Sequence, residues 1–137
     1  MGLAEVSNVL WRERELLEVL LFKLEEEQLL LAAGRTRWLA RATHEVDLVL
    51  EQIRETELLR AVEVDDAALE LGLEPSPSLL ALAVQAGGPW REILLQHRQG
   101  FMELTEAIQH LAAANRQILA EGARATRDAL FFVDKAI

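Results

Sequence analysis

The chain has 137 residues and a formal net charge of −9, from 23 acidic and 14 basic side chains. This acidic balance argues against a nucleic-acid partner, because binding to phosphates needs a clustered basic surface. Cysteine is absent, which excludes disulfides and thiolate metal sites. Leu and Ala dominate the apolar residues and favour helices, so we expect one all-α domain over residues 1–137.

The first predicted helix covers residues 3–33. Its apolar residues follow alternating steps of three and four: Leu3, Val6, Leu10, Leu17, Leu20, Leu24 and Leu31. At 1.5 Å per residue such a helix reaches about 45 Å, so its apolar stripe needs equally long neighbours. Gly34 is the expected stop and Thr36 the expected cap of the next helix. The short connection predicts an antiparallel hairpin.

The second predicted helix covers residues 37–62. Its heptad positions hold Leu39, Ala42, Val46, Val49, Ile53 and Thr56. Residues 63–89 form a connector in which we expect one or two short helices. The first would begin at Asp65 and Asp66 and stop at Gly72. In the second, Ser76 would cap a first turn that contains Pro77.

The third predicted helix covers residues 90–133. Its heptad seam contains Phe101, Leu104, Ile108, Leu111, Asn115, Ile118, Gly122, Ala125, Ala129 and Phe132. An amide in this seam has two interpretations: Asn115 is buried and fixes register and partner choice, or it is exposed on a curved helix. Together the three helices predict an elongated antiparallel bundle of three long helices, with the short helices in the connector.

The sequence offers little for catalysis. His44, His97 and His110 are the only histidines, and no pair has the i, i+4 spacing of a zinc site. No Glu-x-x-His motif occurs, which argues against a di-iron site. We expect no metal, no cofactor and no enzyme activity. The run Glu25–Glu27 is expected to be a solvated face. We expect the three tryptophans, Trp11, Trp38 and Trp90, to be buried where helices meet.

Apolar residues near the end of the third helix lie off its seam. Such surface is either covered by the short helices or left for a partner or a second copy. We expect the second outcome beyond Gly122. The predicted partner-binding residues are Leu111, Asn115, Ile118, Leu119, Gly122, Leu130, Phe131 and Val133.

The arrangement resembles the FlgN-type flagellar export chaperones, from "LWRERELLEVLLFKLEEEQLLLAAGRTRW" through "SPSLLALAVQAGGPW" to "LTEAIQHLAAANRQILAEGARATRDAL". The most specific match is an Asn followed by an Ile-Leu pair, here Asn115, Ile118 and Leu119. The resemblance implies a cytoplasmic chaperone that binds the C-terminal helical segments of hook-associated (hook–filament junction) proteins. It would prevent their premature assembly and deliver them to the flagellar type III export apparatus.

Two further expectations accompany this interpretation. The longest apolar stretches, "LLEVLLF" and "LLALAVQAGG", are shorter than the roughly 20 residues that span a bilayer, and the amino-terminal sequence lacks the pattern of a signal peptide. We therefore expect no membrane span. The alternative function is a structural coiled coil that only self-associates, for example as a homodimer.

Overall fold

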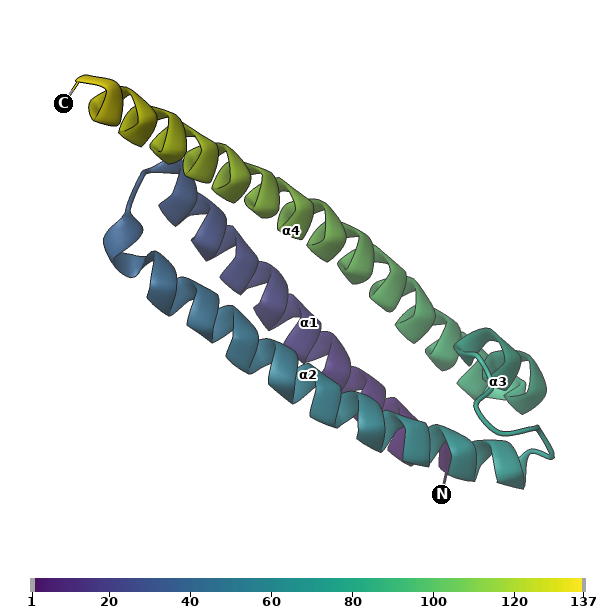
Figure 1. Cartoon of the computed structure of the whole chain (residues 1–137). Coiled ribbons are helices and arrows are strands. Elements are labelled where there is room, and N and C mark those ends of the chain that lie inside the picture. Colours follow the sequence, from purple (N-terminus) through teal and green to yellow (C-terminus); the bar gives the residue numbers. More distant parts are fainter. Residues whose placement is uncertain (1, 137) are drawn as a thin grey trace.

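The computed structural model describes the backbone of residues 2–136 and the side chains of residues 2–121. Over this part the chain is all-helical, as predicted, with four helices: α1 (Gly2–Ala32), α2 (Thr36–Glu70), α3 (Leu79–Ala86) and α4 (Gly88–Ala136). Three of them are long, with 31, 35 and 49 residues, whereas α3 has 8. Figure 1 shows the long helices running side by side, with α3 at one end.

The helix α1 is the centre of the fold. It packs against α2 as an antiparallel hairpin and against α4 in a parallel direction, whereas the described parts of α2 and α4 lack a comparable contact with each other. The expected bundle of three long helices is therefore confirmed only in part. The long helices are present, but they form an open arrangement in which α2 and α4 flank α1.

Two apolar clusters hold the helices together. The first contains residues of all four helices: Val6, Leu10, Val64, Ala67, Leu82, Ala83 and Leu94. The second contains residues of the three long helices alone: Leu20, Leu24, Val46, Val49, Ile53 and Leu111. Burying each of the Val, Leu and Ile side chains in these clusters stabilises the fold by about 1.5–3 kcal/mol. Since α3 reaches only the first cluster, the two ends of the molecule are covered differently.

The predicted boundary of the second helix was wrong. It continues to Glu70 instead of ending at residue 62, and Asp65 and Asp66 lie inside it. The chain has no Gly or Pro between Thr36 and Glu70, and the packing of Val64 and Ala67 supports the additional turns. The helix stops before Gly72, whose φ of +72° suits glycine. Only one short helix, α3, therefore remains in the connector.

Both predicted helix caps were also wrong. Ser78, not Ser76, is the N-cap of α3, where its side chain accepts a 3.0 Å hydrogen bond from the Ala81 amide. The Ser76 amide instead donates to Asp65 Oδ1 at 2.7 Å, which ties the connector to α2. At the start of α2 the cap position is Arg35, which makes no side-chain capping bond. The stop at Gly34 was correct, since α1 ends at Ala32 and Gly34 has φ +67°.

Two predictions about burial were wrong as well. Trp11 and Trp38 are 53% and 46% exposed rather than buried. Each ring instead contacts an arginine, with Arg14 Cζ 4.4 Å from the Trp11 centroid and Arg37 Cζ 4.8 Å from the Trp38 centroid. In the run Glu25–Glu27, Glu27 is buried and 7% exposed. A solvated face therefore describes this run only in part.

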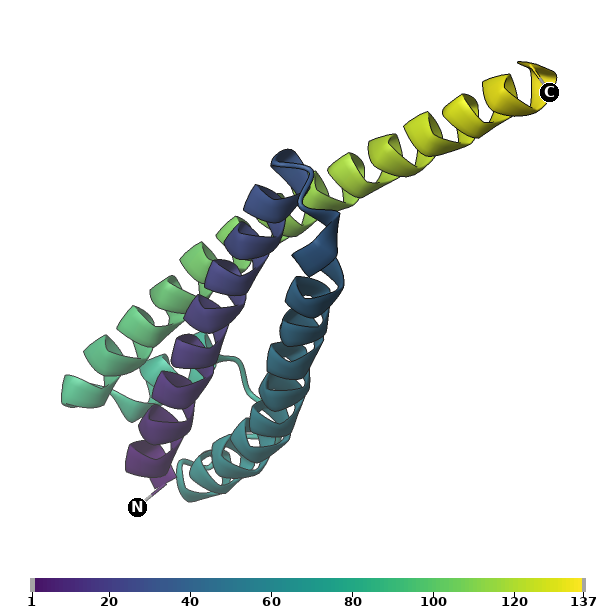
Figure 2. The same cartoon turned by 90° about the vertical axis from the view of Figure 1, so that its left-hand side faces the viewer.

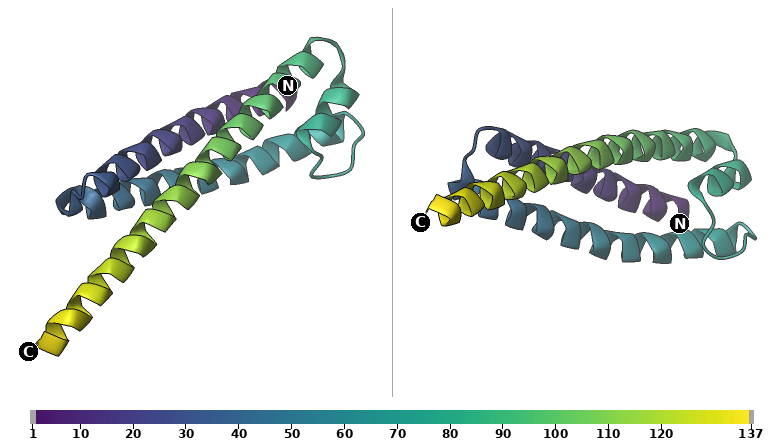
Figure 3. Two further views of the ribbon diagram at one scale, coloured as in Figure 1. Left: turned by 90° about the horizontal axis from the view of Figure 1, so that it is seen from above. Right: turned by 45° about the horizontal axis from the view of Figure 1, so that its top comes forward.

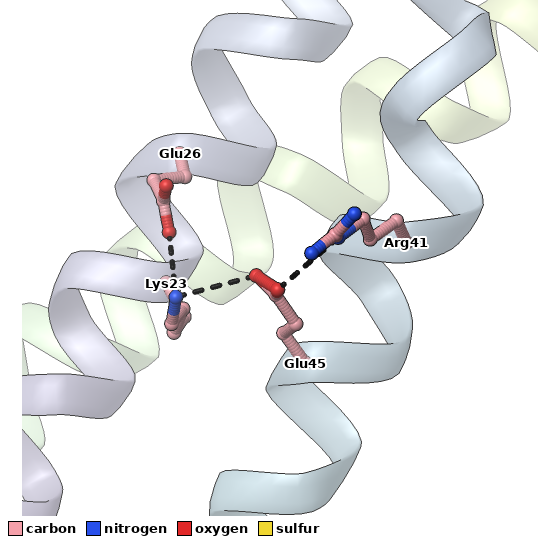
Figure 4. A network of polar contacts seen from close by, with 4 residues as sticks. All are labelled: Lys23, Glu26, Arg41 and Glu45. Carbon is pink, nitrogen blue, oxygen red and sulfur yellow. Dashed lines mark hydrogen bonds and ion pairs between the residues drawn. The ribbon is translucent and has the colours of Figure 1, made fainter.

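A surface network links α1 to α2 on the outer side of the hairpin (Figure 4). Lys23 Nζ lies 3.2 Å from Glu26 Oε1 and 3.2 Å from Glu45 Oε1, and Arg41 Nε lies 3.6 Å from Glu45 Oε2. The hydrogen bonds to Glu26 and Glu45 raise the pKa of Lys23, and the bond from Lys23 lowers the pKa of Glu45. Exposed pairs contribute little stability, so this network adds only a small amount to the apolar packing of the two helices.

Candidate partner-binding site

An apolar groove runs between α2 and α4, with α1 as its floor. Its volume is about 330 Å³. We call it the lateral groove and define it by Leu20, Leu24 and Glu27 of α1, Val46 and Leu50 of α2, and Ile108, Ala112, Asn115, Arg116 and Leu119 of α4. Most of these side chains are apolar. A groove with such a lining is suited to the apolar face of a helix.

The lateral groove exists because α3 is short. At the opposite end of the molecule, α3 lies between α2 and α4 (Figures 1 and 3), and its Leu82 and Ala83 are completely buried in the four-helix cluster. The eight residues of α3 do not extend to the second cluster. The same three helices are therefore covered by a fourth at one end and left open at the other.

A buried polar network lies at one end of the lateral groove. Asn115 is 2% exposed, and its Nδ2 donates to Leu24 O at 2.9 Å and to Glu27 Oε1 at 3.0 Å. Both partners can only accept here, so the orientation of the amide is fixed. Thr43 Oγ1 donates to Glu27 Oε2 at 3.0 Å. The Asn115 amide thus connects α4 to α1, and the Glu27 carboxyl group that it contacts also connects α1 to α2.

A second polar position in the seam of α4 is His97, which is 1% exposed. Its Nε2 lies 3.1 Å from Ser7 Oγ, and its Nδ1 lies 3.4 Å from Arg14 Nη1. Because a guanidinium only donates, Nδ1 is the acceptor and Nε2 carries the proton. Burial, assisted by the charge of Arg14, lowers the pKa of His97. The histidine is thus satisfied by its neighbours Ser7 and Arg14.

The predicted partner-binding residues fall into three groups. Leu111 and Asn115 lie inside the molecule, in the second cluster and the polar network. Ile118 is half-buried, and Leu119 is 42% exposed at the lip of the lateral groove. The side chains of Gly122, Leu130, Phe131 and Val133 lie outside the described part, although α4 continues through these positions as one helix.

Sequence reasoning missed most of the lateral groove. Leu20, Leu24, Leu50 and Ala112 were assigned to internal packing or were not singled out, yet all four line it. The available signal was the width of the stripe on α1, where Leu16 and Leu21 flank the seam positions. A stripe that wide serves more than one neighbouring helix.

Comparison with known families decides the identity. The family model described as FlgN protein matches residues 1–137, which is the whole chain. The chain belongs to the FlgN family. Membership supports a role as a flagellar export chaperone. Comparisons of the chain with curated proteins and with solved structures gave no match.

Two properties of this FlgN-family chain complete the description. None of the helices between residues 2 and 136 combines the length and apolar character that crossing a bilayer requires. Among the side chains of residues 2–121, no three His, Asp or Glu groups are arranged to hold a metal ion.

Proposed function

We propose that this FlgN-family protein acts in the cytoplasm and binds the C-terminal helical segments of hook–filament junction proteins. Binding keeps those segments from assembling before export and delivers them to the flagellar type III export apparatus. The contact runs along α4 and includes Ile118, Leu119, Leu130, Phe131 and Val133. Leu111 and Asn115 support it from within, since they fix α4 on α1.

The observation that carries this proposal is the length of α4. It has 49 residues, compared with 31 in α1 and 35 in α2, and its last turns extend past the connection between these two helices (Figures 2 and 3). Among the helices described between residues 2 and 136, none lies beside that end. Its sequence nevertheless continues the apolar seam with Ala125, Ala129 and Phe132. A partner helix would shield this seam from water.

The test is a titration of the purified chain with a synthetic peptide that spans the C-terminal helical segment of the hook–filament junction protein of the same bacterium. We expect Leu119→Asp and Phe131→Asp each to weaken binding by at least about tenfold, as loss of a central apolar contact does. Isothermal titration calorimetry measures the affinity, and far-UV circular dichroism verifies that the helical content is unchanged.

Ala113→Asp is the matched control, because Ala113 is exposed on α4 and is not among the residues of the lateral groove. It adds the same charge, and we expect it to bind the peptide with unchanged affinity. The proposal fails if the unmodified chain does not bind the peptide. It also fails if all three variants bind as tightly as the unmodified chain.

A further inference from the structure

We infer that the lateral groove is a second docking site, which receives an amphipathic helix of about three turns from the same export substrate, end to end with α3. This inference rests on the proposed function, because the occupant is a part of that substrate. It adds a place on the chaperone that shares Leu119 with the proposed contact but lies away from the terminal turns of α4. It also specifies the chemistry of the segment that binds there.

The first argument is the packing of α3. This helix occupies the channel between α2 and α4 at one end of the molecule, and Leu82 and Ala83 are 0% exposed there. The channel beside Leu20 and Leu24 has the same three walls but no fourth helix. A second helix in line with α3 would complete the four-helix cross-section that the chain already forms at its other end.

The second argument is the size and lining of the site. From Ile108 to Leu119, the α4 wall spans about 16 Å at 1.5 Å per residue, which corresponds to about three helical turns. Its central residue is Ala112, whose small side chain leaves room for a larger one from the occupant. An occupant with apolar residues at i, i+3, i+4 and i+7 would bury them against this wall and the floor.

The third argument is charge. At one end of the lateral groove, Nδ2 of Asn115 donates to Glu27. Arg116 is exposed at that end and makes no ion pair among the described residues. A carboxylate near the end of the bound helix complements this guanidinium. The occupant is therefore an amphipathic helix with an acidic residue at its Arg116 end.

Two other occupants fit less well. The chain carries a formal net charge of −9, so two copies repel each other at long range. The terminal segment of the chain's own α4 continues as one helix and leads away from the hairpin (Figures 2 and 3). Turning back into the lateral groove would require that helix to break. A segment of a different protein meets neither obstacle.

The first experiment uses a unique thiol, because the chain has no cysteine. Ala112→Cys places a thiol inside the lateral groove, and Ala113→Cys places one on exposed surface of the same helix. Each variant is alkylated with and without the saturating substrate peptide. We expect the peptide to slow the reaction at position 112 by at least about tenfold and to leave position 113 unchanged. Equal rates with and without peptide at position 112 overturn the inference.

The second experiment blocks the site. Ala112→Trp fills the lateral groove, whereas Ala113→Trp adds the same ring to exposed surface, and circular dichroism tests the fold of both. We expect Ala112→Trp to weaken peptide binding by at least about tenfold and Ala113→Trp to leave it unchanged. We expect Arg116→Glu to weaken binding by about threefold or more, and increasingly so at low ionic strength.

The outcomes separate this inference from the proposed function. If Phe131→Asp abolishes peptide binding but Ala112→Trp and the Ala112→Cys protection assay show no effect, the terminal contact stands and the docking site in the lateral groove is refuted. If sedimentation velocity shows that Ala112→Trp dissociates a dimer without changing peptide affinity, the occupant is a second copy and the inference is likewise refuted.

Discussion

Asn115 of α4 and Glu27 of α1 are buried against each other, with Nδ2 of the amide 3.0 Å from Oε1 of the carboxyl group. The same amide donates to the backbone oxygen of Leu24 at 2.9 Å. Moving α4 along α1 by one heptad would place Leu20 or Gly34 where Glu27 now lies, and neither has a side-chain acceptor for the amide. The pair therefore fixes the register of the two parallel helices, and the alternative of an exposed amide was wrong.

Substitution of Asn115 should reveal the strength of this pair. We expect Asn115→Leu to lower the free energy of unfolding by about 2 kcal/mol, because Glu27 loses a buried donor. Asn115→Asp should lower it by about 3 kcal/mol or more, since it also places a second carboxyl group beside Glu27. Urea denaturation followed by circular dichroism measures both. The double variant Asn115→Leu with Glu27→Leu should recover most of the loss. An equal loss of stability in Asn115→Leu and Asn115→Asp would contradict this account.

The buried His97 predicts a loss of stability in mild acid. Its folded-state pKa is lowered from 6.5 by burial and by Arg14, so the unfolded chain takes up a proton at a higher pH than the folded chain does. The contribution of this neutral histidine is present above pH 6.5 and is lost as the pH falls from there through the folded-state pKa. We expect the free energy of unfolding to fall as the pH drops below 6.5. His97→Gln should flatten that part of the profile, and an unchanged slope would refute the assignment.

The pair Glu13 and Arg60 predicts a dependence of the opposite sign. Glu13 is 3% exposed, and burial raises its pKa above 4.5, although Arg60, with Nη1 3.1 Å from Oε1, opposes the rise. The folded state therefore loses stability as the pH rises from 4.5 through the raised pKa. Arg60→Ala should extend that loss, with a decrease of about 1–3 kcal/mol near neutral pH and a smaller one near pH 4. In a Glu13→Gln background, the loss of stability caused by Arg60→Ala should no longer depend on pH.

Two glycines predict opposite responses to alanine. A Cβ at Gly2 would lie 3.0 Å from the Cα of Ala67, a backbone atom of α2 that cannot move alone. We expect Gly2→Ala to lower the free energy of unfolding by about 1 kcal/mol. A Cβ at Gly100 would lie 2.6 Å from Nη2 of Arg14, the end of a flexible side chain. Gly100→Ala should leave stability unchanged or raise it by up to about 1 kcal/mol through helix propensity. Thermal unfolding of both variants, measured under the same conditions, tests the contrast.

The helices themselves were largely predictable because the signal for a helix is local. The heptad positions predicted in α2 include five of its buried residues: Ala42, Val46, Val49, Ile53 and Thr56. The stops at Gly34 and Gly72 were correct because a positive φ is a property of the residue and its turn. Thr56 can be buried at a heptad position because its hydroxyl donates to Gln52 O within its own helix, which is also a local contact.

The lateral groove was not predictable from those same patterns. Heptad periodicity indicates which face of a helix is apolar, but α1 uses one broad face for α2, for α4 and for the floor between them. Whether α2 and α4 meet above this face of α1 or leave a groove depends on the angle and position at which each of them crosses α1. The local sequence of α2 or α4 does not encode that crossing geometry.

The sequence by itself determined that this protein is a set of long amphipathic helices with an amide in the seam of the last one, because periodicity and turn residues act over a few positions. Only the tertiary structure decided that Glu27 is buried while Trp11 and Trp38 are exposed. The burial of a polar or aromatic side chain depends on what the facing helix offers, and for Glu27 the decisive donor, Asn115, lies 88 residues away along the chain.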